Sequence, residues 1–166
     1  MPTLTAFQSI FVSELQATEI PFLIIGGKAI QAHGIERLTQ DLDILVSRTG
    51  TLPDMLLPLV AKRMARSSPK LTAEMLRLPQ KLVCLPDLQG KEVDILTSIG
   101  ALDFELAAEM SVIVNFGEVS LRVLGLEELI YSKVVAASKI DAPEARRRNL
   151  EDMQKLLALW ESRRVK

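Results

Sequence analysis

The chain has 166 residues, of which 48% are hydrophobic, 25% charged and 4% aromatic, and its formal net charge is −1. A chain of this length and apolar content is expected to form one domain with its own core. A net charge this close to zero argues against nucleic-acid binding that is driven by positive charge alone.

Hydrophobic periodicity predicts alternating helices and strands in the first half of the chain. In chain order we expect a helix over residues 4–17, a strand over 22–25, a short helix over 28–33, a strand over 41–46 and a helix over 52–66. Gly26 and Gly27 break the first strand, and Gly34 ends the short helix. Residues 67–80 are left without a predicted element.

The second half of the chain predicts two strand pairs and three helices. We expect strands over 81–85 and 91–97, a helix over 103–110, strands over 112–114 and 119–123, and helices over 126–138 and 146–161. A turn over 86–90 joins the first strand pair, and Asn115-Phe116-Gly117 joins the second pair as a hairpin. This mixture predicts an α+β or mixed α/β domain over residues 1–166, with a core of about 20–125 and a helical C-terminal part of about 126–162.

The sequence also predicts the compartment. Its one cysteine, Cys84, lies in an apolar run, so neither an intramolecular disulfide nor a CxxC zinc site is expected. The first residues lack the basic start of a signal peptide, and no apolar run approaches the roughly 18 residues that span a membrane. We therefore expect a cytoplasmic protein without a membrane partner.

Two acids stand close together in the predicted strand over residues 41–46. Side chains on a strand alternate between faces, so Asp41 and Asp43 should emerge on one side while Leu42 and Ile44 point into the core. Two carboxylates this close repel each other unless a cation lies between them, and Mg²⁺ prefers such oxygen ligands. The alternative is a pair of acids on a solvated strand face.

Two further features bear on this pair. Gly26 and Gly27 precede the short helix, and glycine allows close backbone approach where helix amides suit a phosphate; an ordinary tight turn is the alternative. Asp94 lies in an apolar strand between Val93 and Ile95, where a buried charge requires a partner. The alternative for Asp94 is an edge strand with one wet face.

A known family shares this arrangement. Gly26-Gly27, thirteen intervening residues and then Asp41-Leu42-Asp43-Ile44 resemble the signature of the polymerase-β-like nucleotidyltransferase superfamily. With His33-Gly34 and Arg37-Leu38-Thr39-Gln40 included, the stretch is most similar to its small prokaryotic branch of minimal nucleotidyltransferases and AbiEii-type toxins. The resemblance spans roughly residues 20–160, with 50–80 unassigned. It implies a nucleotidyltransferase fold, in which helices flank a mixed β-sheet and further helices follow at the C-terminus.

The resemblance also implies a reaction and a site. Asp41, Asp43 and Asp94 would be the catalytic carboxylates and would coordinate two Mg²⁺ ions, or Mn²⁺, together with an NTP. A hydroxyl acceptor would then attack the α-phosphorus in line. The residues implied to bind the nucleotide are Gly26, Gly27, Lys28, Arg37, Thr39 and Lys133. Arg37 would contact phosphate or brace an aspartate; exposed, solvated charges are the alternative for both Arg37 and Lys133.

The sequence departs from the family pattern at two informative positions. Gly27 stands where active members often carry serine, and Asn149 stands where aspartate is frequent. Substrate binding is therefore less well determined than the carboxylates. A non-catalytic or partner-dependent nucleotide-binding module, such as one component of a toxin–antitoxin system with an antitoxin partner, is the alternative function.

The sequence does not select the acceptor, which could be RNA, a protein hydroxyl or a small molecule. Residues 133–166 carry nine bases and five acids, so the C-terminal helices could face a polyanion such as tRNA. A solvated helix surface is the alternative. The oligomeric state is left open as well.

Overall fold

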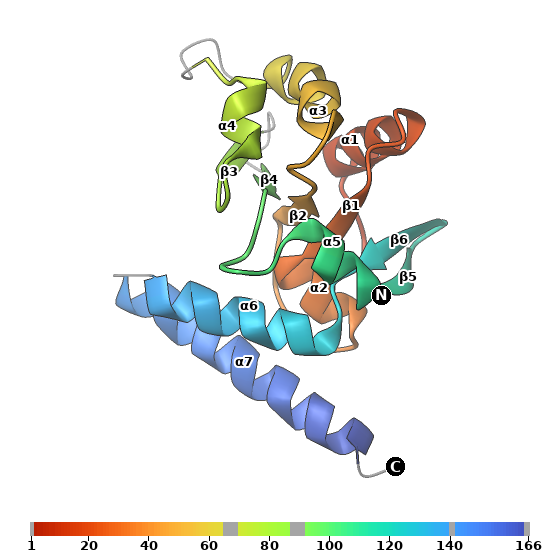
Figure 1. The fold of residues 1–166 in the computed structure, drawn as a ribbon. Coiled ribbons are helices and arrows are strands. Elements are labelled where there is room, and N and C mark those ends of the chain that lie inside the picture. The colour runs from red at the N-terminus through yellow and green to blue at the C-terminus, as the bar shows by residue number, and fades with distance from the viewer. Residues whose placement is uncertain (1, 65–69, 87–91, 140–141, 165–166) are drawn as a thin grey trace.

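The computed structural model describes residues 2–64, 70–86, 92–139 and 142–164. The helices are α1 (Ala6–Ala17), α2 (Gly26–Ala32), α3 (Leu52–Ala61), α4 (Ala73–Arg77), α5 (Phe104–Glu109), α6 (Leu126–Lys139) and α7 (Pro143–Arg164). The strands are β1 (Phe22–Ile25), β2 (Leu42–Val46), β3 (Leu82–Pro86), β4 (Glu92–Leu96), β5 (Val112–Phe116) and β6 (Val119–Val123). Figure 1 shows α1, α3 and α4 on one side of the molecule and the α6–α7 pair on the other.

The strands form a six-stranded sheet in the order β3-β4-β2-β1-β6-β5. The pairs β1–β6 and β2–β4 are parallel, whereas β1–β2, β3–β4 and β5–β6 are antiparallel. All four residues of β1 are buried, as an apolar run in a central strand requires. The mixed sheet with flanking helices confirms the predicted fold class.

Two boundaries near the predicted site differ from expectation. Helix α2 begins at Gly26 rather than at Lys28, because the positive φ of Gly26 (60°) lets the chain turn from β1 directly into the helix. Strand β2 begins at Leu42 rather than at Asp41. Its pairing with β1 ends where Ile25 meets Asp43, so β1 offers no further backbone partner toward Asp41.

Other boundaries differ further from the site. Helix α4 lies in the stretch left without a prediction, and its N-cap residue Thr72 accepts a hydrogen bond from the Met75 amide at 3.3 Å. Helix α3 ends at Ala61, earlier than the predicted residue 66, which itself lies outside the described residues. Of the turn expected over 86–90, only Pro86 is described, and it ends β3.

The C-terminal helices pack against each other along their length (Figure 1). Helix α7 begins at Pro143, a residue suited to a first helical turn because no intrahelical partner is needed for its nitrogen. Its two buried positions, Asp152 and Leu156, are four residues apart and share one face. None of the helices within the described ranges is long and apolar enough to cross a membrane.

Candidate active site

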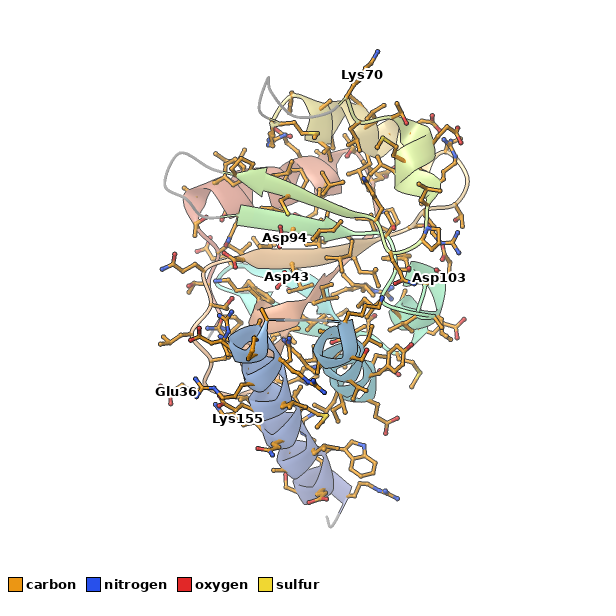
Figure 2. All side chains as sticks on the ribbon, turned by 90° about the vertical axis from the view of Figure 1, so that its left-hand side faces the viewer. Glu36, Asp43, Lys70, Asp94, Asp103 and Lys155 are labelled. Carbon is orange, nitrogen blue, oxygen red and sulfur yellow. The ribbon has the colours of Figure 1, made fainter. Side chains whose placement is uncertain are left out.

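Two acids lie side by side on neighbouring strands of the sheet. Asp43 of β2 is in register with Asp94 of β4, and the two strands are parallel. Adjacent strands are about 4.8 Å apart, and residues in register point to the same face. Figure 2 shows both residues near the middle of the sheet, above α6 and α7. The fold therefore brings together two carboxylates that are 51 positions apart in sequence.

The glycine at the start of α2 makes room for one of these carboxylates. A Cβ atom added to Gly26 would lie 1.9 Å from Oδ2 of Asp43, so no side chain fits there without displacing the acid. The next amide, that of Gly27, donates a hydrogen bond to Asp43. At Gly26 the backbone thus closely approaches Asp43, whereas the approach of a phosphate to this glycine pair stays a prediction.

The acid pair holds more negative charge than its surroundings neutralise. Burial, together with the charge of Asp94, raises the pKa of Asp43 to about 6, although Lys133 and the Gly27 amide oppose the shift. Within the described structure, Oδ1 of Asp94 is buried without a hydrogen-bond partner. Crowded carboxylate oxygens of this kind fit a hard divalent cation such as Mg²⁺.

Asp41 is placed differently from the prediction. It is exposed and lies in the α2–β2 loop (residues 33–41), one residue before β2, so strand alternation does not set its side-chain direction. Among the described residues, no three His, Cys, Asp or Glu side chains lie close enough together to hold a metal ion. The structure therefore pairs Asp43 with Asp94 and leaves Asp41 beside the pair.

Two other residues that were predicted to bind the nucleotide make contacts at α2. The Thr39 side chain lies against Gly27, where an added Cβ atom would be 2.6 Å from Oγ1 of Thr39. The ammonium of Lys28 is buried and donates to the carbonyl of Thr3 at 2.7 Å. Lys28 therefore ties α2 to the N-terminal segment, whereas Thr39 covers the backbone at the start of the helix.

A buried acid on α7 joins two of the predicted cations. Asp152 is 3% exposed, and its carboxylate lies 2.9 Å from Nε of Arg37 and 3.0 Å from Nζ of Lys133. The Lys133 ammonium also donates to Oδ1 of Asn149 at 3.3 Å. Arg37 thus braces Asp152 rather than Asp41 or Asp43. Asp152 is not among the predicted site residues, although an acid in line with Leu156 on one face of α7 is a signal for a buried partner.

Two cavities border residues of the predicted site. The first has a volume of about 470 Å³ and is lined by Asp43, Gly26 and Lys133 together with apolar side chains of β4 and α6 such as Leu96 and Val135. The second has a volume of about 460 Å³ and is lined by Arg37, Leu38, Thr39, Gln40, Asp41 and Arg148. Asp43 therefore borders a largely apolar cavity, whereas Asp41 borders a polar one.

Comparisons with known proteins bear on the fold. No protein-family model matches the sequence, and a search of curated proteins finds no match. The structure resembles an antigenic nucleotidyltransferase-like protein from Paracoccidioides brasiliensis with a TM-score of 0.58 and 14% identity, covering 94% of this chain and 78% of that one. It also resembles the lincosamide antibiotic adenylyltransferase LnuA, solved with lincomycin, with a TM-score of 0.52 and 10% identity over 93% of this chain and 99% of that one. At such low identity the likeness establishes a shared fold.

Proposed function

We propose, on the premise that this chain has the nucleotidyltransferase fold, that it transfers a nucleoside monophosphate from an NTP to a hydroxyl acceptor with the help of Mg²⁺. The observation that carries the proposal is the pairing of Asp43 with Asp94 on one face of the sheet, with Gly26 against the first carboxylate. A fold alone does not require two acids to crowd at its centre. Their mutual repulsion costs free energy that a bound cation would offset.

In this proposal Asp43 and Asp94 would hold the metal, and Asp41 would contribute to its site from the α2–β2 loop. Bound divalent ions, Mg²⁺ or Mn²⁺, stabilise negative charge on the attacking and leaving oxygens of phosphoryl transfer. The raised pKa of Asp43, about 6, means that this carboxylate is mostly ionised near neutral pH and is then ready to coordinate. The family resemblance implies two such ions, bound by Asp41 and Asp43, with Asp94 completing the second site.

The other site residues would bind the nucleotide. Lys133 lines the first cavity beside Asp43, where its ammonium would neutralise phosphate charge. Gly26 and Gly27 allow phosphate oxygens to approach the backbone, and the Thr39 hydroxyl lies next to Gly27. Lys28 and Arg37 would contribute through the contacts that they make within the fold.

The acceptor is the least determined part of the proposal. A small molecule is the first class to test, because LnuA, which shares the fold, was solved with lincomycin. RNA, including tRNA, and protein hydroxyls are the other classes. Membership of the small prokaryotic branch with AbiEii-type toxins stays a prediction.

The position of Asp41 favours a second candidate. Since three potential ligands do not converge among the described residues, the chain could be a nucleotide-binding module that becomes active only with a partner. An antitoxin of a toxin–antitoxin system would be one such partner. The two candidates differ in one result: the module binds a nucleotide but transfers nothing when alone.

The test begins with calorimetry of the purified chain with ATP and CTP, each with and without Mg²⁺. We expect Mg²⁺-dependent binding that Asp43→Asn and Asp94→Asn abolish. Asp54→Asn is the matched control, because Asp54 is an exposed acid of α3 that pairs only with Arg77 in the described structure. The proposed site would be contradicted if the control variant lost binding, or if both site variants kept it.

The second step asks for transfer. The chain is incubated with NTPs labelled at the α-phosphate and with total RNA, lysate protein or a small-molecule hydroxyl panel. The proposed function predicts label on one of these acceptors and its loss in Asp94→Asn. Binding without any labelled product would favour the module.

A further inference from the structure

Asp41 needs a restraint other than the sheet. It precedes β2, and the α2–β2 loop that carries it has no helix or strand along residues 33–41. A carboxylate that contributes to a metal site must keep its direction, because metal ligands bind within narrow distance limits. A contact to the peptide group just before Asp41 can supply this restraint.

A buried glutamine from α1 holds that peptide group. Gln8 is 0% exposed, and its Nε2 donates to the carbonyl oxygen of Gln40 at 2.7 Å, across 32 positions of sequence. The Oε1 atom of the same amide accepts from the Thr5 backbone amide at 3.1 Å. The orientation of the Gln8 amide is fixed by these two partners, since one is a donor and the other an acceptor.

Gln8 therefore performs two tasks at once. Its side chain completes the capping box of α1, in which the backbone N–H of Gln8 also donates to Oγ1 of Thr5 at 3.2 Å. Glutamate serves this box equally well and is favoured by the charge at a helix N-terminus. An ionised glutamate has no hydrogen to donate to the carbonyl of Gln40, however. The contact to the α2–β2 loop thus requires the side-chain amide of glutamine, whereas the helix cap by itself does not.

We propose that Gln8 is a positioning residue for Asp41: by holding the Gln40 carbonyl, it restrains the end of the α2–β2 loop from which the Asp41 carboxylate would contribute to a metal held by Asp43 and Asp94. The inference rests on the proposed function.

The middle of the loop has its own anchor. Nε2 of Gln31 donates to the carbonyl of Arg37 at 2.5 Å, and the Arg37 side chain pairs with Asp152. Loss of the Gln8 contact should therefore loosen the end of the loop next to Asp41 and leave the rest in place. The expected consequence is a defect in metal use rather than a general loss of the site.

Two substitutions separate the tasks of Gln8. Gln8→Glu keeps the capping box and removes the donor to Gln40, while Gln8→Met keeps the side-chain volume and avoids a buried charge. Thr5→Ala is the matched control, since it removes the N-cap hydroxyl and leaves the contact between Gln8 and Gln40 intact. The readouts are the Mg²⁺ concentration that half-saturates ATP or CTP binding, followed by calorimetry, and the thermal unfolding midpoint.

We expect both Gln8 variants to need roughly tenfold more Mg²⁺, because residues that orient metal ligands typically change metal affinity by about 10-fold to 100-fold. Saturating Mg²⁺ should restore nucleotide affinity in them, which a general packing defect would not allow. Thr5→Ala should lower the unfolding midpoint and keep the wild-type Mg²⁺ requirement.

Three outcomes count against the inference. A wild-type Mg²⁺ requirement in Gln8→Met would overturn it while leaving the proposed function in place. An equal rise in the Mg²⁺ requirement of Thr5→Ala would overturn it too, because the loss of helix capping would then explain the effect. If the wild-type chain binds neither ATP nor CTP with Mg²⁺, the proposed function fails and this inference fails with it.

Discussion

At the start of α2, residue choice is dictated by what lies opposite the backbone. Gly26 faces Oδ2 of Asp43 and Gly27 faces Thr39, each closer than a Cβ atom could tolerate. Gly26 also has a φ of 60°, a conformation that side-chain-bearing residues rarely adopt. The two glycines are thus required by different neighbours, although they look alike in the sequence.

The acid pair should lower the free energy of unfolding of the metal-free protein. Between pH 3.8 and about 6 the folded state keeps a proton on Asp43 that the unfolded state has released. The free energy of unfolding therefore falls as the pH rises through this window, and the cost is fully present above it. A shift of this size corresponds to about 3 kcal/mol at most.

Asp43→Asn should remove that cost. In urea unfolding with EDTA present, we expect the variant to gain stability relative to wild type as the pH rises from 4 to 7, by up to about 3 kcal/mol. Asp54→Asn, at an exposed position, should show no such trend. Parallel pH profiles for wild type and Asp43→Asn would contradict the assigned charge repulsion.

Serine at position 27, which active members of the superfamily that the sequence resembles often carry, should destabilise this protein. The new Cβ atom would meet Oγ1 of Thr39 at 2.6 Å and Cβ of Thr39 at 2.7 Å. We expect Gly27→Ser to cost about 1–3 kcal/mol by overpacking.

A double-mutant cycle with Thr39→Gly, which removes both obstructing atoms, checks this clash. The double variant should be more stable than the sum of the single effects predicts. Strict additivity would show that the two side chains do not compete for the same space.

At the level of elements, the joint between α7 and the rest of the molecule is ionic as well as apolar. Asp152 contacts Arg37 of the α2–β2 loop and Lys133 of α6, while Leu156 is fully buried one turn later. The Asp152 carboxylate thus links α7 to the α2–β2 loop and to α6, and it keeps the Lys133 ammonium near Asp43. Arg37 and Lys133, which looked like independent nucleotide ligands in the sequence, share this single anchor.

Asp152→Asn should test that joint. Removing the charge leaves two cations near one another with a neutral partner, and breaking a buried ion pair from one side costs about 3–5 kcal/mol. We expect Asp152→Asn to lower the free energy of unfolding, measured in urea, by an amount near the lower end of this range. Nucleotide binding should become weaker as well.

Glu151→Gln is the neighbouring control, because among the described residues Glu151 forms only an exposed pair with Arg147. Its effect should stay within about 0.5 kcal/mol. Equal losses at the two positions would mean that the buried pairs add nothing specific.

At the scale of the whole molecule, the site exists only in the folded chain. Its groups come from α2, β2, β4 and α6, and the supporting Asp152 comes from α7. In the unfolded chain these groups are far apart on average. A ligand of the site should therefore bind the folded state alone and stabilise it.

Mg²⁺ together with an NTP should accordingly raise the thermal unfolding midpoint. At a nucleotide concentration 100 times its Kd, the gain in unfolding free energy is about 2.7 kcal/mol. EDTA should reverse the gain, and the nucleotide without metal should produce little of it. An unchanged midpoint in scanning calorimetry, at nucleotide concentrations well above a measured Kd, would show that the nucleotide binds the unfolded chain as well.

Much of the architecture could be predicted from local signals. The β1 run is uniformly apolar and becomes a central strand, and the acids at 43 and 94 interrupt apolar strands that prove to be neighbours. Helix α4 escaped prediction because it is only five residues long, too short for periodicity to register. Strand β2 begins one residue later than predicted, because the end of a strand depends on its partner strand.

The sequence by itself determined the fold class and the candidate acids, because hydrophobic period and isolated charges in apolar strands are local properties. Tertiary structure alone decided which groups meet: Asp43 with Asp94, Gly26 with Asp43, Lys133 with Asp152 and Gln8 with Gln40. These pairings depend on strand register and helix packing between distant segments, and no local pattern encodes either. For the same reason Asp41, which looked equivalent to Asp43, lies off the strand.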